Sequence, residues 1–466
     1  MTDSFRRKPP DVSHPSASVE IGVARRDVTP PVGIYARQWG AAEHDAAEGI
    51  HRPLTANVMV LRESADAAPF VLASVDGGWW QDLDDEARVR NALIDAHGLD
   101  PARVLIALSH THAACSLCTD DADKPGGDLV GPYLGKVADA LIDAVGEAIQ
   151  NAQPGTLDWC QGRCGLAAVR DLPDPDADRY VLGTNPTQPA DDTVLVGRAS
   201  DGDGRILGTI VNYACHATTL AWDNRLISPD YVGAMRDLVE DHTNGAPCLF
   251  LQGASGELGP RQGFTGDTAI ADANGRWLGY SVVAALESML PPRTGMTYAG
   301  IVESGAPIAT WQRHPFEPMR VLEAKQIDIE LPLKPLPTVE EVSKQLEACT
   351  DRVQAERLRR RLRQLRKTGT GPTVAVPTWF WRVGQAVFVA HPNETYSTLQ
   401  TMLRLLFPEV ALPVITVVNG GMGYIAPAEL HDTDIYQVWS SPFGPEALNT
   451  LIDACTTQIS RMIDSD

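Results

Sequence analysis

The stretch "LIALSHTHAAC", residues 105–115, leads a short apolar segment directly into two histidines. An apolar run of this length without polar alternation is typical of a strand that is buried on both faces of a sheet. Side chains of an extended chain alternate between two sides, so His110 and His112 would point to the same side and could serve one site. The stretch therefore predicts a buried sheet that ends in either a metal site or a simple polar strand end.

The same pattern recurs along the chain and extends the prediction to the whole fold. Short runs rich in Val, Ile and Leu alternate with amphipathic segments and with Gly and Pro, which predicts the α/β class, with mixed buried β-sheets layered with helices. Ser228, Pro229 and Asp230 form a favourable helix start. The predicted strands are 57–63, 70–76, 103–109, 193–199, 206–214, 247–253, 385–391 and 413–421. The predicted helices are 84–97, 133–151, 229–242, 268–290, 339–367 and 394–407.

Composition limits the class of function. The 466 residues include 39 Lys and Arg against 60 Asp and Glu, which gives a formal net charge of −21. This charge repels phosphate backbones and anionic lipid headgroups, so we expect a small-molecule substrate rather than nucleic acid or a membrane. Residues 1–18 lack the apolar core of an export signal, so we expect a flexible N-terminal tail on a cytoplasmic protein.

The eight cysteines are sparse in a chain of this length, and we expect them to be reduced thiols. Cys115 and Cys118, joined with Cys160 and Cys164, leave open a four-thiolate zinc site, although the second spacing is poor. The simpler interpretation is four unrelated small side chains.

One predicted helix, 339–367, is unusually basic. Its part "RVQAERLRRRLRQLRK", residues 352–367, carries eight of the 39 cations of the chain. Leu358, Leu362 and Leu365 lie on one stripe that can pack, which leaves the other faces to the arginines. We expect a solvated helix that balances the acidic body; a subunit contact in a homo-oligomer, or a binding role, remains open.

Several predicted strands end in polar residues of metal-ligand type. Ligands of α/β sheets bind beyond the carboxyl ends of strands, where residues from several strands can converge. Each residue has a simpler interpretation by itself; Glu394, for example, opens a predicted helix, where a carboxylate is favoured. Taken together they supply the nitrogen and oxygen ligands of a catalytic zinc site. The strand-end residues are Asp76, His110, His112, His216, Glu257, Glu394 and Tyr424.

Motifs around these residues resemble a known family. "IGVARRDVTPPVG" (21–33), "SHTHAA" (109–114), "AAVRDLPD" (167–174), "SPDYVG" (228–233) and "NGGMGYIAPAEL" (419–430) follow one another in the order of that family's motifs. From about residue 19 to 450 the chain resembles the catalytic N-terminal domain of neutral/alkaline, non-lysosomal ceramidases, which are zinc amidases that hydrolyse the N-acyl bond of ceramide. The resemblance implies a single ceramidase-like catalytic domain over 19–466, with 339–367 as a basic helical insertion and without the family's C-terminal Ig-like domain.

The resemblance also implies one zinc per chain and a role for each site residue. The zinc ligands of the family correspond here to His110, His216, Glu394 and Tyr424. His112 and Arg170 correspond to residues that lie beside the metal.

These roles imply a zinc-dependent hydrolase that cleaves an amide or ester bond in a soluble small molecule by zinc-activated water. His112 would move a proton to the leaving group, and Arg170 or Tyr424 would stabilise the oxyanion. Asp76 and Asp230 would fix the imidazole tautomers or, equally, serve as helix-start or turn residues.

The chain departs from the family at "GELGP", where the family has "GDVSP" with an active-site serine. Gly259 takes the place of that serine, so only attack by water remains available. Glu257, if it lay near the metal, would favour a cationic or hydroxyl-rich substrate. Alternative functions are a zinc-dependent lactonase, lyase or isomerase on the same site, or a metal-binding protein without turnover.

Overall fold

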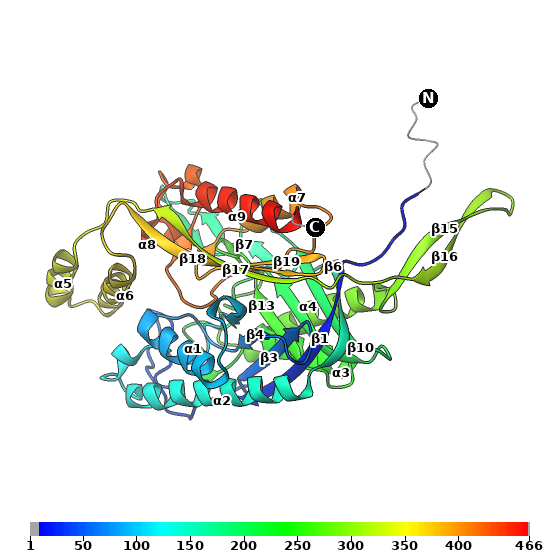
Figure 1. Ribbon diagram of the computed structural model, residues 1–466. Helices are drawn as coiled ribbons and strands as arrows, with labels where there is room; N and C mark the ends of the chain where they lie inside the picture. Colours follow the sequence, from blue (N-terminus) through cyan, green and yellow to red (C-terminus); the bar gives the residue numbers. More distant parts are fainter. Residues whose placement is uncertain (1–8, 465–466) are drawn as a thin grey trace.

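The computed structural model describes residues 9–464 of the chain. Figure 1 shows two β-sheets stacked face to face, with helices on both outer sides. The larger sheet has eight strands in the order β13-β11-β10-β6-β1-β3-β4-β5, and the smaller has four in the order β17-β18-β19-β21. The predicted α/β class, with mixed buried sheets layered with helices, is confirmed.

The eight-stranded sheet is buried on both faces. Val58 and Val60 face a helix-covered core, whereas Met59 and Leu61 face the second sheet, which explains the apolar runs without polar alternation. The pairs β4–β5 and β11–β13 are parallel and the other neighbours antiparallel. The strands are β1 (Ser16–Asp27), β3 (Thr55–Arg62), β4 (Phe70–Val75), β5 (Val104–Leu108), β6 (Gln153–Arg163), β10 (Thr193–Asp201), β11 (Ile206–Tyr213) and β13 (Cys248–Gln252).

Four helices cover the outer face of this sheet. They are α1 (Leu83–His97), α2 (Val130–Asn151), α3 (Tyr231–His242) and α4 (Thr268–Ser288). The start predicted for α3 at Ser228 is wrong by a few residues. Asp230 is the N-cap, with a φ of 55°, and its side chain accepts a hydrogen bond from the Tyr231 amide.

The smaller sheet packs its inner face against the larger one through aromatic side chains. Trp381 and Phe388 share a core with Ile21 and Trp159 of the larger sheet. The helix predicted over 394–407 begins only at Thr398, because the preceding residues form a short strand. The elements are β17 (Leu322–Pro332), β18 (Thr373–Val383), β19 (Ala386–Ala390), β21 (Val414–Ile415), and the outer helices α7 (Thr398–Leu406) and α9 (Ala447–Ile463).

Short elements complete the fold, and one hairpin projects from the body in Figure 1. This hairpin, β15 (Thr294–Glu303) with β16 (Pro307–Pro315), was not among the predicted strands. The remaining strands and α8 are β2 (Gly49–Ile50), β7 (Ala167–Val169), β8 (Asp171–Pro173), β9 (Tyr180–Leu182), β12 (Leu226–Ile227), β14 (Leu258–Pro260), β20 (Glu394–Thr395), β22 (Tyr424–Ile425) and α8 (Tyr436–Ser440). The 3₁₀ turns are Pro101–Arg103, Thr119–Asp121, Gly127–Leu129 and Ala428–Leu430.

The basic segment 339–367 is two helices rather than one. α5 (Val339–Ala348) begins with a capping box between Thr338 and Glu341. α6 (Arg352–Thr368) has Asp351 as its own N-cap, so the chain breaks between the two helices. Figure 1 places the pair at one end of the molecule, next to α8.

Both described ends of the chain belong to the fold, since β1 buries Ala17 and Ile21 and α9 buries Leu451 and Ile459. The predicted N-terminal tail, 1–18, lies partly outside the described residues, and β1 already begins at Ser16. Between residues 9 and 464, no helix is both long enough and apolar enough to cross a bilayer. All eight cysteines are free thiols.

Candidate metal centre

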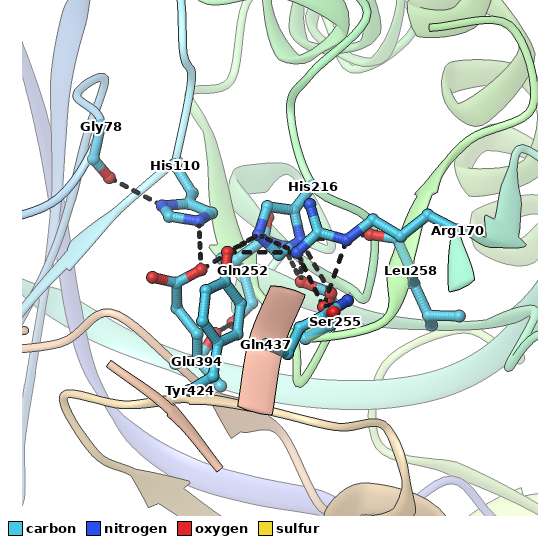
Figure 2. A network of polar contacts seen from close by, with 12 residues as sticks. Gly78, His110, Arg170, His216, Gln252, Ser255, Leu258, Glu394, Tyr424 and Gln437 are labelled. Atoms are coloured by element: carbon cyan, nitrogen blue, oxygen red, sulfur yellow. Dashed lines mark hydrogen bonds and ion pairs between the residues drawn. The ribbon is translucent and has the colours of Figure 1, made fainter. Parts of the chain in front are cut away.

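The predicted ligands follow strands of the larger sheet or lie in the separate short pair β20–β22, and they meet at one place. His110 follows β5 in the left-handed conformation, with a φ of 61°, and His216 follows β11. Glu394 and Tyr424 face each other as partners in the short parallel pair β20–β22, which lies on the side of the smaller sheet. Figure 2 shows the four side chains converging.

One carboxylate oxygen lies between two imidazoles. Glu394 Oε2 is 3.1 Å from His110 Nε2 and 3.0 Å from His216 Nε2. His110 and His216 are fully buried, whereas 17% of the Glu394 side chain is exposed. Two nitrogens and one oxygen thus point at a common centre, the arrangement of a metal site with three protein ligands.

Main-chain carbonyls hold the other nitrogens of the two rings. His110 Nδ1 donates to Gly78 O at 2.9 Å, and His216 Nδ1 donates to Ser255 O at 2.7 Å. A carbonyl can only accept, so each Nδ1 carries the hydrogen and each Nε2 presents its lone pair to the centre. Outer contacts of this kind orient the rings for a metal.

Asp76 and Asp230 do not fix these tautomers, and the alternative of a helix-start residue is confirmed for Asp230. The Asp76 carboxylate pairs with both terminal nitrogens of Arg236 at 2.9 Å. Asp230 accepts from the amides of Leu220 and Tyr231, next to the start of α3. Both carboxylates are therefore fully engaged by groups other than imidazoles.

His112 lies beside the other two histidines with an unused ring nitrogen. Its Nε2 is buried and makes no hydrogen bond to residues 9–464. Its ring lies between those of Trp79, at 4.9 Å, and Trp39, at 5.3 Å. A buried ring nitrogen without a partner is costly unless a metal or a reacting proton satisfies it.

Arg170 and Tyr424 close one side of the cluster. Arg170 Nη2 donates to the Tyr424 hydroxyl at 3.1 Å and to Gly256 O at 2.7 Å, and it lies 3.2 Å from His216 Nε2. The Tyr424 hydroxyl is itself 3.4 Å from His216 Nε2. All six predicted site residues are therefore brought together; their individual roles stay predictions.

The electrostatics favour the ligand forms of these groups. Burial, followed by the charge of Arg170, lowers the pKa of His216 to about 3. Burial and the neighbouring imidazoles also hold the pKa of His112 well below its usual value. Burial opposes ionisation of Glu394, but the imidazoles of His110 and His216 outweigh it and keep that pKa well below its ordinary range. Neutral imidazoles and an ionised carboxylate are the forms that bind a metal.

The residues present fit a divalent metal. In the part of the chain that the structure describes, His110, His112 and His216 form the one group of three or more His, Cys, Asp or Glu whose ligand atoms all lie within 4.8 Å of one another. Glu394 contributes a carboxylate oxygen that lies close to the Nε2 atoms of His110 and His216. Nitrogen-rich sets with one carboxylate suit zinc.

Glu257 does not act on this cluster. Both of its oxygens accept from the Ser397 amide, at 3.0 and 2.9 Å, and the Ser397 hydroxyl donates to one of them. The carboxylate thus stabilises the start of α7. Among the described residues, no contact supports the hypothesis that Glu257 favours a cationic or hydroxyl-rich substrate. Gly259 lies opposite Ala168 in the pair β14–β7, and a Cβ there would be 3.7 Å from Arg170 Cδ.

The environment of Glu257 makes stability depend on pH. Burial raises the pKa of Glu257 from 4.5 to about 7. The folded state therefore keeps a proton that the unfolded chain releases, so the free energy of unfolding falls as pH rises from about 4.5 through about 7. Glu257→Gln removes this loss, and we expect the variant to gain about 3 kcal/mol on the wild type between pH 5 and pH 8.

Urea unfolding at the two pH values measures this difference. Glu409→Gln, at an exposed position, is the matched control and should keep the same offset from wild type at both pH values. A Glu257→Gln variant with the same offset from wild type at both pH values would contradict the prediction.

Sequence reasoning missed the groups around the ligands. Gly78 and Ser255 act through main-chain carbonyls, and the aromatic rings of Trp39 and Trp79 flank His112. The carbonyls leave no residue signature. The tripeptide "GWW" at residues 78–80, shortly after a predicted strand, was a signal that could have drawn attention to Trp79.

Comparison with known proteins gives consistent results. A family model described as neutral/alkaline non-lysosomal ceramidase, N-terminal, matches residues 19–259. A neutral ceramidase of Pseudomonas aeruginosa is 24% identical over 262 residues, which are 52% of this chain and 37% of that protein. This chain therefore matches little more than a third of the relative's own length. His110, His112, Arg170 and His216 lie within the matched range 19–259.

Solved structures extend the likeness in fold over nearly the whole chain. The crystal structure of neutral ceramidase from Pseudomonas aeruginosa superposes with a TM-score of 0.67 and 18% identity, and covers 96% of this chain and 75% of that chain. A structure entitled "Ceramidase complexed with C2" gives a TM-score of 0.67 and 16% identity over 94% of this chain and 74% of that chain. Glu394 and Tyr424 fall in the part that only the structural likeness covers.

Proposed function

Because the chain belongs to the neutral/alkaline non-lysosomal ceramidase family, we propose that it is a zinc-dependent hydrolase of N-acyl amide bonds. The observation that carries the proposal is the position of Glu394 Oε2, which lies between the Nε2 atoms of His110 and His216. The carbonyl acceptors on their Nδ1 atoms favour the same interpretation, since they leave both Nε2 lone pairs directed at the centre.

A zinc ion held by His110, His216 and Glu394 would supply a Lewis acid and a bound water of lowered pKa. Tyr424 is the fourth ligand or a hydrogen-bond donor beside it. Arg170 is buried, and its guanidinium keeps a fixed positive charge next to the centre, where the oxyanion of a tetrahedral intermediate would be stabilised.

His112 fits the role of proton acceptor in this scheme. Its Nε2 is unpaired, and burial lowers its pKa, so the ring is neutral at physiological pH. A neutral imidazole accepts a proton from the nucleophile and can then pass it to the leaving amine. Trp79 and Trp39 contact the ring and help to hold it in place.

Two observations bear on the substrate. The relative's name, neutral ceramidase, makes a ceramide-like lipid amide one class. The net charge of −21 disfavours contact with anionic lipid surfaces, so we propose that the amide is taken from solution rather than from such a surface.

The proposal is tested by elemental analysis of the purified protein together with a substrate panel. We expect about one zinc per chain and hydrolysis of short-chain N-acyl amides. The panel contains a short-chain ceramide, the same ceramide in anionic vesicles, soluble N-acyl amides, and matched esters and lactones. Absence of stoichiometric metal, or turnover of lactones without any amide hydrolysis, would overturn the proposal.

A further inference from the structure

The cations of α6 divide into two groups. Most of them have a carboxylate partner: Arg352 with Asp45, Arg359 and Arg360 with Glu356, Arg363 with Asp121, and Arg366 with Asp120. Arg357, Arg361 and Lys367 form no ion pair with a carboxylate among residues 9–464. Lys367 Nζ instead donates to Trp80 O at 2.9 Å and to Gly421 O at 2.7 Å, whereas Arg357 and Arg361 lie one helical turn apart. Like charges at this spacing repel each other, and the body of the protein offers an excess of acidic groups.

Both unpaired arginines face Trp439 on α8. The guanidinium of Arg357 lies over the Trp439 ring at 5.2 Å, and Arg361 Nη1 donates to Trp439 O at 3.2 Å. A third cation lies alongside: Lys334 Nζ donates to Val438 O at 2.6 Å and has no carboxylate partner in the described part of the chain. We call Lys334, Arg357 and Arg361 the Trp439 cation cluster.

The electrostatics of the cluster favour an anionic neighbour. Burial, and then the charge of Arg361, lowers the pKa of Lys334 to about 8. Burial also lowers the pKa of Arg361. An anionic group beside Lys334 and Arg361 would relieve these costs, because ammonium and guanidinium groups donate strong hydrogen bonds to it, and the exposed Arg357 lies on the same Trp439 side chain.

A row of aromatic rings connects this cluster to the candidate metal centre. The ring of His216 stacks on Tyr424 with centroids 6.2 Å apart, Tyr424 contacts Tyr436 at 5.7 Å, and Tyr436 contacts Trp439 at 5.1 Å. Trp439 is 38% exposed, so the row runs from the buried centre to the surface. The Tyr424–Tyr436 and Tyr436–Trp439 contacts are edge to face and Arg357 lies over Trp439, so the row supplies apolar ring edges rather than open faces along this line.

We propose that the Trp439 cation cluster is an anion-binding subsite, and that the substrate is an amide joined by an apolar spacer to a carboxylate or phosphate. The amide would lie at the His110–His216–Glu394 centre, the spacer along the aromatic row, and the anion between Arg357, Arg361 and Lys334. This inference deepens the proposed function and rests on it.

The test uses two pairs of probes that differ only in charge. One pair is 8-(acetylamino)octanoate and its uncharged terminal amide; the other is the mono-anilide of suberate and its terminal amide. They place the anion on the amine side and on the acyl side of the scissile bond. For at least one pair we expect the wild type to prefer the anion by about tenfold or more in kcat/KM.

The variant Arg357→Gln/Arg361→Gln should lose this preference, with little change in kcat/KM for the uncharged probes. Arg366→Gln is the matched control, because it removes one charge of the same helix from a pair with Asp120, and it should keep the preference. The single variants Arg357→Gln and Arg361→Gln serve if the double variant fails to fold. Equal kcat/KM for charged and uncharged probes in the wild type would overturn the inference, and so would a preference that survives in the variants.

Calorimetric binding of the same probes to protein treated with chelator separates this inference from the proposed function. We expect the charged probe that the wild type prefers to bind about tenfold more weakly to the double variant than to the wild type or to Arg366→Gln. Charge-selective binding that depends on these arginines, without hydrolysis of any probe, would sink the proposed hydrolase and leave the subsite standing. Hydrolysis of the probes, combined with binding that does not depend on their charge, would support the proposed hydrolase and overturn the subsite.

Discussion

Glu394→Gln is expected to lower zinc occupancy by more than tenfold and amide hydrolysis by more than a hundredfold. The amide keeps the shape of the side chain, but it loses the negative charge that lies between His110 and His216. Ionised carboxylate is the ligand form, and a neutral oxygen binds the metal much more weakly. Elemental analysis and initial rates on the same preparation measure both effects.

Chelation offers an independent readout of the same site. Metal that binds only the folded state raises the midpoint of thermal unfolding, so chelator should lower this midpoint in the wild type and leave it nearly unchanged in Glu394→Gln. Glu409→Gln, at an exposed position, should behave as the wild type does. Full zinc occupancy in Glu394→Gln would show that the three histidines bind the metal without the carboxylate.

Asp76→Asn is expected to destabilise the protein by about 3–5 kcal/mol, because it leaves a buried guanidinium without its counter-ion. Asp76 is 1% exposed and Arg236 4% exposed, and the two side chains meet through two hydrogen bonds of 2.9 Å. The pair joins the end of β4 to α3. Urea unfolding followed by circular dichroism gives the change in free energy.

An exposed ion pair provides the comparison. Glu340 and Lys344 are one turn apart on α5 with a contact of 2.8 Å, and most of both side chains is exposed. Glu340→Gln should cost at most about 0.5 kcal/mol. A cost for Asp76→Asn no larger than that of Glu340→Gln would mean that water reaches Arg236 and that the pair is not buried in solution.

Local sequence was sufficient to predict the strands that carry the histidines. The apolar runs before Ser109 and before His216 form β5 and β11, because strands buried on both faces need no polar alternation. Periodicity alone does not indicate the side on which the strand ends meet. That side was indicated by the ordered likeness to the ceramidase family, which also pointed to Glu394 and Tyr424.

The wrongly predicted elements share one physical cause: contacts with residues far away in the sequence determine their structure. Glu394 was expected to open a helix, but it pairs with Tyr424, thirty positions along, in the short strand β20. Asp76 was expected to support an imidazole, yet its partner is Arg236, which is 160 positions away. The hairpin β15–β16 lies outside both sheet cores, so burial leaves no apolar pattern in most of it.

The spread of the ligands along the chain has a consequence for biosynthesis. His110 and Glu394 are separated by 284 positions and His216 and Glu394 by 178, so the carboxylate is the last of the three to leave the ribosome. At about 5–20 residues per second, His110 waits roughly 15–60 s for Glu394 to be synthesised. During that interval the larger sheet can assemble, but its two histidines lack their acidic partner. A metal ion held by all three ligands would then bind late, after Glu394 has been synthesised.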